Sequence, residues 1–433
     1  MSRSDLLPLM ADTQVVRLAC PLSSLAVEVR VPIRTGASGE SFMPVELRDS
    51  TFRANPAFEL VLLEQLPANQ QESLSALRDD PSVYGVVRSR AAPGLSTKAV
   101  THDTAALLEA LKKPRPLPEE VVHDSVAELE ITRLVWDGVL QIRKDGKWIC
   151  GPDACSLTAS DSAKERGTLA DLSLQALQHA AALWTGGTAE LSGTLYRYNT
   201  IPLTPQWVRR IPDQNTLREY LQIQPGGRNR RDLDRSWLQV SPAGEHAPWL
   251  SWVSRTVPVD PQRTAYKLYL SPLPSNLREA FRVWLAAITI AGAFHFKLGS
   301  NVRGLLRPDK MVAYFNDRAA LDDAAERISR ELSGYPAQGV PFTAELGCGA
   351  LMSWGIDPSA DEMVPVWLRQ QSWRQWVCNR LGAALAVAKH YQSNVLPAWR
   401  FALERLRLEG VDVASWASLT ASEKKLASEI TVL

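Results

Sequence analysis

The chain has 433 residues, 45% of them hydrophobic, and its 48 Lys and Arg residues nearly balance 47 Asp and Glu residues. A chain of this length is expected to form two or three packed domains. The net charge of +1 excludes a general electrostatic attraction to nucleic acid or to an anionic membrane surface. The start, MSRSDLLPLMADTQ, lacks a signal-peptide pattern, and no window holds 18 uninterrupted apolar residues. These features predict a cytoplasmic protein without a membrane span.

The five cysteines are scattered along the chain, which favours a reducing compartment. Cys150 and Cys155 have no second Cys/His pair nearby, so no metal site is expected. The sequence also contains no Walker A loop, dinucleotide fingerprint, GxSxG or HExxH motif. We therefore expect no metal and no cofactor.

The first 262 residues divide into three segments. Residues 1–111 alternate short apolar runs with turn residues, which indicates a mixed α/β domain that binds a peptide or a partner. KKPRPLPEE at 112–120 is typical of a linker. Residues 121–262 form an intermediate region, with a hairpin around Lys144–Gly146 and a helix over 169–184.

Residues 263–433 contain clearer signals. YKLYLS (266–271), FHFKLG (294–299) and MVAYF (311–315) are predicted strands. Helices are predicted over 276–292, 317–334, 373–391 and 398–410. This order predicts an α+β fold, in which helices pack on a mostly antiparallel sheet.

Cations gather in one stretch, FHFKLGSNVRGLLRPDK (294–310), where Asp309 is the only acid. Residues two apart on a strand point to the same face, so His295 and Lys297 share a face, as do Lys267 and Tyr269. If the two strands lie in one sheet as neighbours, all four side chains form one surface. A solvated basic face is the simple interpretation. Crowded cations also favour a neutral lysine that can act as a general base, while arginine stays charged and binds an oxyanion.

Several motifs carry a resemblance to a known family. The runs YKLYLSP, FHFKLG, RGLLRPDKMVAYF, AQGVPFTAELG and LMSWGIDP resemble the HopA-type effector family, which includes lyase components of class V lanthipeptide and thioamitide clusters. That family is distantly similar to bacterial phosphothreonine lyases. The resemblance covers roughly 265–410 and is looser over 130–265.

The resemblance implies roles for particular residues. Phosphothreonine lyases carry a Lys-x-His motif, a base lysine and a phosphate-binding arginine, and these align with Lys267-Leu268-Tyr269, Lys297 and Arg307. Tyr269 stands where the acid histidine is expected, so either His295 or Tyr269 would be the proton donor. Further residues expected at the phosphate are Lys310, Arg374 and Arg380, with Thr343 lining the substrate site.

The chemistry implied is β-elimination of phosphate from phosphoserine or phosphothreonine, which gives dehydroalanine or dehydrobutyrine. The expected partners are a phosphorylated precursor peptide and a separate Ser/Thr kinase, because the chain carries no kinase motif. The alternative is a non-catalytic effector or scaffold that binds a phosphopeptide or a partner protein through the same basic face. A lysine at 297 that is buried close to Arg307 would favour the lyase.

Overall fold

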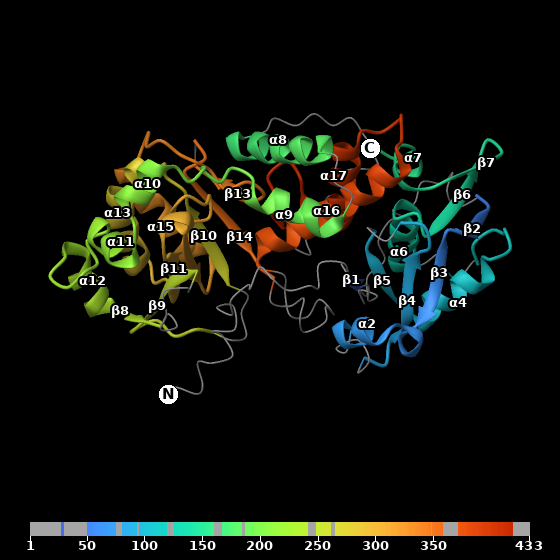
Figure 1. The fold of residues 1–433 in the computed structure, drawn as a ribbon, viewed down its shortest axis with the longest axis horizontal. Helices are drawn as coiled ribbons and strands as arrows, with labels where there is room; N and C mark the ends of the chain where they lie inside the picture. The colour runs from blue at the N-terminus through green and yellow to red at the C-terminus, as the bar shows by residue number, and fades with distance from the viewer. Residues whose placement is uncertain are drawn as a thin grey trace.

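The computed structural model describes residues 27–29, 50–74, 80–92, 95–118, 121, 125–159, 167–183, 187–240, 248–260, 265–347, 349–357 and 371–418. Its helices and antiparallel sheets confirm the predicted α+β class. Figure 1 shows a large sheet at one end of the molecule, smaller sheets at the other end, and four helices between them: α8 (Thr168–Ala182), α9 (Thr188–Arg197), α16 (Trp373–Tyr391) and α17 (Ala398–Leu408).

The large sheet has seven strands, and every neighbouring pair in it is antiparallel. Their order across the sheet is β13 (Ala344–Leu346), β14 (Met352–Ile356), β10 (Tyr266–Leu270), β12 (Met311–Phe315), β11 (His295–Gly299), β9 (Trp249–Ser254) and β8 (Trp237–Gln239). The predicted strands β10 and β11 therefore lie in one sheet. They are not neighbours, because β12 lies between them.

One face of this sheet forms a hydrophobic core with α13 (Leu277–Ile290) and α15 (Arg318–Glu331). Phe296 on β11 lies at its centre. Its ring stacks on Trp252 at a centroid distance of 4.7 Å and meets Trp284 edge-on at 5.2 Å. The strand residues that alternate with this face point to the opposite side, where Tyr269, Val312 and Tyr314 belong to a smaller buried cluster.

The helix predictions for this region agree with the structure. Asp317 caps α15 by accepting a hydrogen bond from the backbone N–H of Ala320 at 2.8 Å. Asn276 precedes α13, but its side chain makes no capping hydrogen bond. The remaining short elements here are α10 (Pro205–Arg210), α11 (Gln214–Tyr220), α12 (Arg228–Ser236), the 3-10 helix η3 (Pro274–Asn276) and α14 (Val302–Leu305).

The other end of the molecule holds two smaller sheets. The four-stranded sheet has the order β1 (Val27–Val29), β5 (Thr97–Thr101), β4 (Val83–Ser89) and β3 (Phe58–Leu62), and the three-stranded sheet has the order β2 (Phe52–Ala54), β6 (Leu140–Lys144) and β7 (Lys147–Ile149). The predicted hairpin is β6–β7, whose turn residues Asp145 and Gly146 both have positive φ. The helical elements of this part are η2 (Leu63–Gln65), α2 (Ala68–Ser73), α4 (His102–Ala110), α6 (Ser125–Trp136) and α7 (Gly151–Cys155).

The linker prediction for 112–120 is wrong over its described part, 112–118. Arg115 exchanges two backbone hydrogen bonds with Phe52, at 2.9 and 3.1 Å, and Leu117 is buried in the core. A segment that pairs with a strand and buries a leucine is packed against the domain.

The predicted domain boundaries also differ from the observed cores. One core joins residues 52–195 with α16, α17 and the short hairpin of β15 (Val411–Asp412) and β16 (Ala417–Ser418), so the C-terminal helices pack with the N-terminal part. The other core runs from Ile211 to Met352 and includes β8 and β9, which the sequence assigns to the intermediate region. Most of residues 1–49 of the expected N-terminal domain, with Cys20, lie outside the described residues.

In the part of the chain that the structure describes, none of the helices combines the length and apolar character that a membrane crossing requires.

The aromatic centre of the larger sheet gives a stability prediction. Phe296→Ala removes the ring that three tryptophans pack against, and we expect it to lower the free energy of unfolding by about 3–5 kcal/mol. Urea unfolding followed by circular dichroism measures this change. Ile290→Ala is the control, because Ile290 is 65% exposed and its truncation should change stability by about 0.5 kcal/mol or less. Equal losses in the two variants would contradict this description of the core.

Candidate active site

The face of the large sheet opposite its core carries the predicted catalytic residues. Directly paired residues of antiparallel strands lie on the same face. Lys267 pairs with Tyr314, which also pairs with His295, and Tyr269 pairs with Val312, which also pairs with Lys297. The predicted shared face is therefore confirmed, with β12 inserted. We call this surface the site face, and its residues are Lys267, Tyr269, His295, Lys297, Val312 and Tyr314.

Lys297 and Arg307 both lie close to one aromatic ring, that of Trp249 on β9. The Lys297 Nζ is 4.9 Å from the centroid of this ring, and the Arg307 Cζ is 5.0 Å from it. Both cations are half-buried. The predicted base and the predicted phosphate-binding arginine are thus brought together around one indole.

Cations and rings alternate throughout the cluster. Tyr314 lies between two lysines, with the Nζ of Lys267 at 5.0 Å and that of Lys297 at 5.5 Å from its centroid. Tyr196 on α9 lies between two arginines, with the Cζ of Arg307 at 5.6 Å and that of Arg374 at 4.6 Å. The contacts connect, in order, Lys267, Tyr314, Lys297, Trp249, Arg307, Tyr196 and Arg374. The negative face of an aromatic ring attracts a cation, so this alternation lets four cations gather.

Asp309 is the acid that neutralises the arginine end of the cluster. It is 4% exposed, accepts two hydrogen bonds from Arg307 at 2.8 Å each, and lies 3.3 Å from Nη1 of Arg374. The hydroxyl of Tyr196 donates to it at 3.1 Å. Burial alone would raise the pKa of the Asp309 carboxyl, but Arg307 and Arg374 together hold that pKa well below its ordinary value. The carboxylate stays ionised and fixes both guanidinium groups.

This arrangement changes the role expected for Arg307. Its Nε and Nη2 atoms donate to Asp309, so the two-pronged edge of the guanidinium faces the protein. Nη2 also donates to the Tyr196 hydroxyl at 3.2 Å. None of the described residues accepts a hydrogen bond from Nη1, and the side chain is 31% exposed. The Nη1 edge is therefore the part of the Arg307 guanidinium that Asp309 and Tyr196 leave unoccupied.

Lys267 is placed differently from the expected phosphate ligand. It is 1% exposed, and its ammonium forms an ion pair with the carboxylate of Asp357. Asp357 is 25% exposed in its side chain and also accepts a hydrogen bond from the backbone N–H of Trp373 at 2.8 Å. Lys267 thus holds Asp357 at the start of α16.

The two candidate proton donors differ in their protonation. Burial, and then the ammonium groups of Lys297 and Lys267, lower the pKa of His295 to about 3. Its ring lies 4.6 Å from that of Tyr314 and is neutral at pH 7. Burial, and then the charge of Asp357, raise the pKa of Tyr269 well above its ordinary value, so Tyr269 keeps its phenolic proton.

Lys310 and Thr343 are both fully enclosed. The Lys310 ammonium donates to Gln338 Oε1 at 2.6 Å and to the carbonyl of Pro272 at 3.0 Å, and burial lowers its pKa to about 7. The Thr343 hydroxyl donates to the carbonyl of Val340 at 2.6 Å and bonds the hydroxyl of Ser353 at 2.8 Å. Both residues support the site from beneath, and neither is placed to contact a substrate directly.

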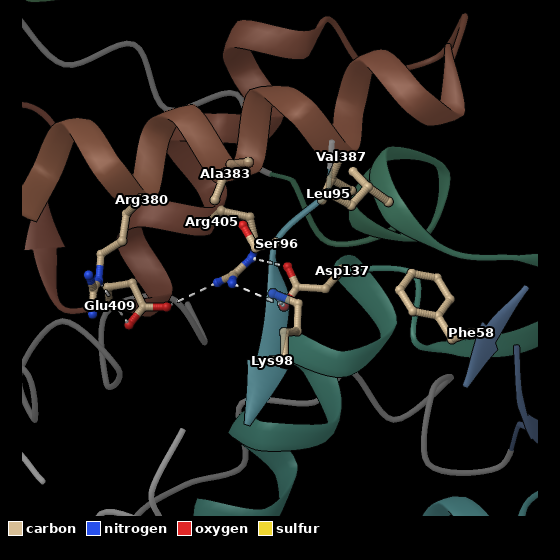
Figure 2. A pocket seen from close by; sticks show the side chains of 11 residues that line it. Phe58, Leu95, Ser96, Lys98, Asp137, Arg380, Ala383, Val387, Arg405 and Glu409 are labelled. Carbon is tan, nitrogen blue, oxygen red and sulfur yellow. Dashed lines mark hydrogen bonds and ion pairs between the residues drawn. The ribbon is translucent and has the colours of Figure 1, made fainter. Parts of the chain in front are cut away.

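The two arginines of α16, Arg374 and Arg380, lie in different surroundings. Arg374 is 1% exposed and donates to the carbonyls of Tyr196 and Pro341, so it belongs to the cluster. Arg380 lies over the ring of Trp376 and approaches Glu409, with its Nε atom 3.8 Å from the carboxylate. Figure 2 shows Arg380 in a different polar pocket, with further ion pairs between Lys98 and Asp137 at 3.1 Å and between Arg405 and Glu409 at 3.2 Å. The structure therefore does not bring Arg380 to the other candidates.

Sequence reasoning missed four members of the site: Trp249, Tyr314, Tyr196 and Asp357. Strand alternation on β9 places Trp249 on the opposite side of the sheet from Trp252, which is in the core. Tyr314 could have been found in the same way once β12 was placed in the sheet. Tyr196 and Asp357 reach the site from distant parts of the chain, and no local pattern indicates them.

Comparisons with solved structures found weak likenesses, which include bacterial effector proteins. No family model matches the chain, and no curated protein matches it. An effector protein from Pseudomonas syringae pv. syringae strain 61 is 14% identical, with a TM-score of 0.38 over 60% of this chain and 100% of that one. A phosphothreonine lyase effector from Chromobacterium violaceum is 12% identical, with a TM-score of 0.23 over 34% of this chain and 77% of that one. At these scores, the reaction has to be argued from the residues of the chain itself.

Metal ligands do not cluster in the described ranges, which contain no group of three or more His, Cys, Asp or Glu side chains arranged to hold an ion. The described cysteines, Cys150, Cys155 and Cys378, are free and buried. Cys20 and Cys348 lie outside the described residues.

The lowered pKa of His295 predicts a dependence of stability on pH. Its folded-state value, about 3, lies below the unfolded value, about 6.5, so the unfolded chain binds the proton first as pH falls. This contribution to stability is complete above about pH 6.5 and is lost progressively toward pH 3. We expect His295→Asn to reduce the fall in melting temperature between pH 7 and pH 5. His390→Asn, at an exposed position, should leave the fall as it is in the wild type. An unchanged fall in His295→Asn would contradict the prediction.

Proposed function

We propose that the site face binds the phosphate of a phosphoserine or phosphothreonine side chain and removes it by β-elimination. The observation that carries this proposal is the pair of half-buried cations, Lys297 and Arg307, at one indole ring. Elimination needs a base at Cα and a cation at the phosphate, a few bonds apart on the substrate. Lys297 supplies the first and Arg307 the second.

The proposed reaction balances without a co-reactant. The neutral amine of Lys297 takes the Cα proton, and the electrons of that C–H bond form the Cα=Cβ double bond. The Cβ–O bond breaks, and phosphate leaves with its electron pair toward Nη1 of Arg307. Dehydroalanine or dehydrobutyrine and inorganic phosphate are the products, and Lys297 returns its proton to water. The neighbouring cations favour the neutral amine before the reaction.

The leaving oxygen can be protonated in two ways. A bound phosphate dianion raises the pKa of His295 and makes it an imidazolium donor. Tyr269 already holds its phenolic proton, although a phenol with a raised pKa is a weak acid. The cations stabilise the departing phosphate in either case, so the donor contributes less than the base.

The finer proposal concerns the substrate. We propose that a separate kinase phosphorylates a precursor peptide, on which this chain then acts in lanthipeptide or thioamitide biosynthesis. The sequence resemblance over roughly 265–410 supports this context. The competing proposal is a non-catalytic effector or scaffold that binds a phosphopeptide. The half-buried position of Lys297 close to Arg307 favours the lyase, because a binding surface does not need a sheltered amine.

Lys297→Ala should abolish phosphate release from a phosphorylated peptide, because it removes the base. Mass spectrometry detects the loss of phosphoric acid from the peptide, and circular dichroism checks that the fold survives. Lys112→Ala is the control, since the side chain of Lys112 is 66% exposed and follows α4, which lies at the other end of the molecule from β11 (Figure 1). A variant at Lys297 with full activity would remove lysine-base chemistry. A wild-type protein that binds the peptide but leaves it intact would favour the scaffold.

Arg307→Ala should weaken phosphopeptide binding by at least about tenfold, since a charge-assisted hydrogen bond contributes roughly 1.5–3 kcal/mol. Calorimetry at low salt measures the dissociation constant. Arg303→Ala is the matched control, because Arg303 is exposed on the neighbouring α14. Arg307→Lys should restore binding only in part, because it loses the paired bonds that Asp309 uses to fix the guanidinium. An unchanged dissociation constant in Arg307→Ala would rule out this placement of the phosphate.

A further inference from the structure

Lys297 is held between two aromatic rings, one from each strand beside its own. Strand β9 contributes Trp249, whose centroid is 4.9 Å from the Nζ, and strand β12 contributes Tyr314, at 5.5 Å. Both rings stand on the site side of the sheet, since the alternate residues of β9 and β12 point into the core. The proposed function assigns no role to either ring.

The proposed reaction creates a charge where the surroundings oppose it. Lys297 is neutral before it takes the Cα proton and is an ammonium afterwards. Arg307 shares the Trp249 ring with it, and Lys267 shares the Tyr314 ring, so each neighbouring cation disfavours this new charge. The Asp309 carboxylate also acts on Lys297, but it is bonded to Arg307, and the neutral His295 adds no charge. Any group that attracts the ammonium as it forms makes the proton transfer easier.

An aromatic ring attracts a cation by only about 0.5–2 kcal/mol and carries no net charge. Two rings therefore support the ammonium without trapping the proton and without opposing the substrate.

We infer that Trp249 and Tyr314 are positioning residues that stabilise the ammonium formed on Lys297 during the reaction. This inference rests on the proposed function and deepens it. The Trp249 ring also contacts Arg307, so it connects the proposed base with the proposed phosphate-binding arginine. Loss of this second contact matters less, since Asp309 and Tyr196 continue to hold Arg307.

The test compares Trp249→Leu and Trp249→Phe in the full chain with a phosphorylated peptide as substrate. In Trp249→Leu we expect kcat to fall by about 3- to 30-fold, KM to change less than kcat, and the acidic limb of the pH–rate profile to move to lower pH. Trp249→Phe keeps a ring and should retain most of the rate. Trp354→Leu is the control, because Trp354 holds Arg318 at 4.0 Å on the opposite face of the sheet. It should leave both kcat and the limb unchanged.

A second measurement does not depend on turnover. NMR of protein labelled with ¹³C at the lysine ε-carbons follows the titration of Lys297, which Lys297→Arg assigns. We expect the midpoint to move to lower pH in Trp249→Leu, because the ring favours the charged form. If the midpoint moves but the wild-type protein releases no phosphate, the ring does stabilise the ammonium, and the proposed reaction is refuted. Phosphate release with neither the midpoint nor the limb moved would overturn the inference about Trp249.

Discussion

The alternation of cations with aromatic rings is the interaction on which the site depends. Four cations packed together repel one another, and carboxylates beside all of them would cancel the charge that binds an anion. The structure uses Asp309 at the arginine end and Asp357 beneath Lys267, and it places rings between the cations. Lys297 and Arg307 are the two half-buried cations of this set, whereas Lys267 and Arg374 are fully buried.

The antiparallel sheet makes this alternation possible. Neighbouring strands lie about 4.8 Å apart, so inserting β12 separates Lys267 from Lys297 by two strand spacings and leaves room for the Tyr314 ring. The same strands send Phe296 and Leu268 into the core on the other face. Packing on that face fixes the register, because a shift by one residue would turn the lysines into the apolar core and the core residues to the opposite face. The positions of the charged groups are thus determined by apolar contacts on the reverse side.

The sequence was sufficient for features that depend on neighbouring residues. Alternation along two strands predicted the site face, and the helix patterns predicted α13, α15 and α16 closely. Periodicity does not say which strand lies beside which, so the insertion of β12 was missed. Periodicity also does not predict the hydrogen-bond partner of a side chain. The ammonium of Lys310 donates to Gln338, and the guanidinium of Arg307 donates to Asp309. Tyr196 lies 111 residues before Arg307, a distance at which no local pattern connects them.

The site also depends on contact between the two hydrophobic cores. The sheet of one core supplies Lys297 and Arg307, whereas α9 and α16 of the other supply Tyr196 and Arg374. Arg374 donates to the carbonyls of Tyr196 and Pro341 and pairs with Asp309, so one buried guanidinium connects both parts. A buried charge needs partners. Nε and Nη2 of Arg374 donate these two hydrogen bonds, and Nη1 meets the Asp309 carboxylate as an ion pair, without a hydrogen bond to any of the described residues. The geometry around Arg307 is therefore complete only when α9 and α16 are packed against the sheet, because Tyr196 and Arg374 reach Arg307 and Asp309 from distant parts of the sequence.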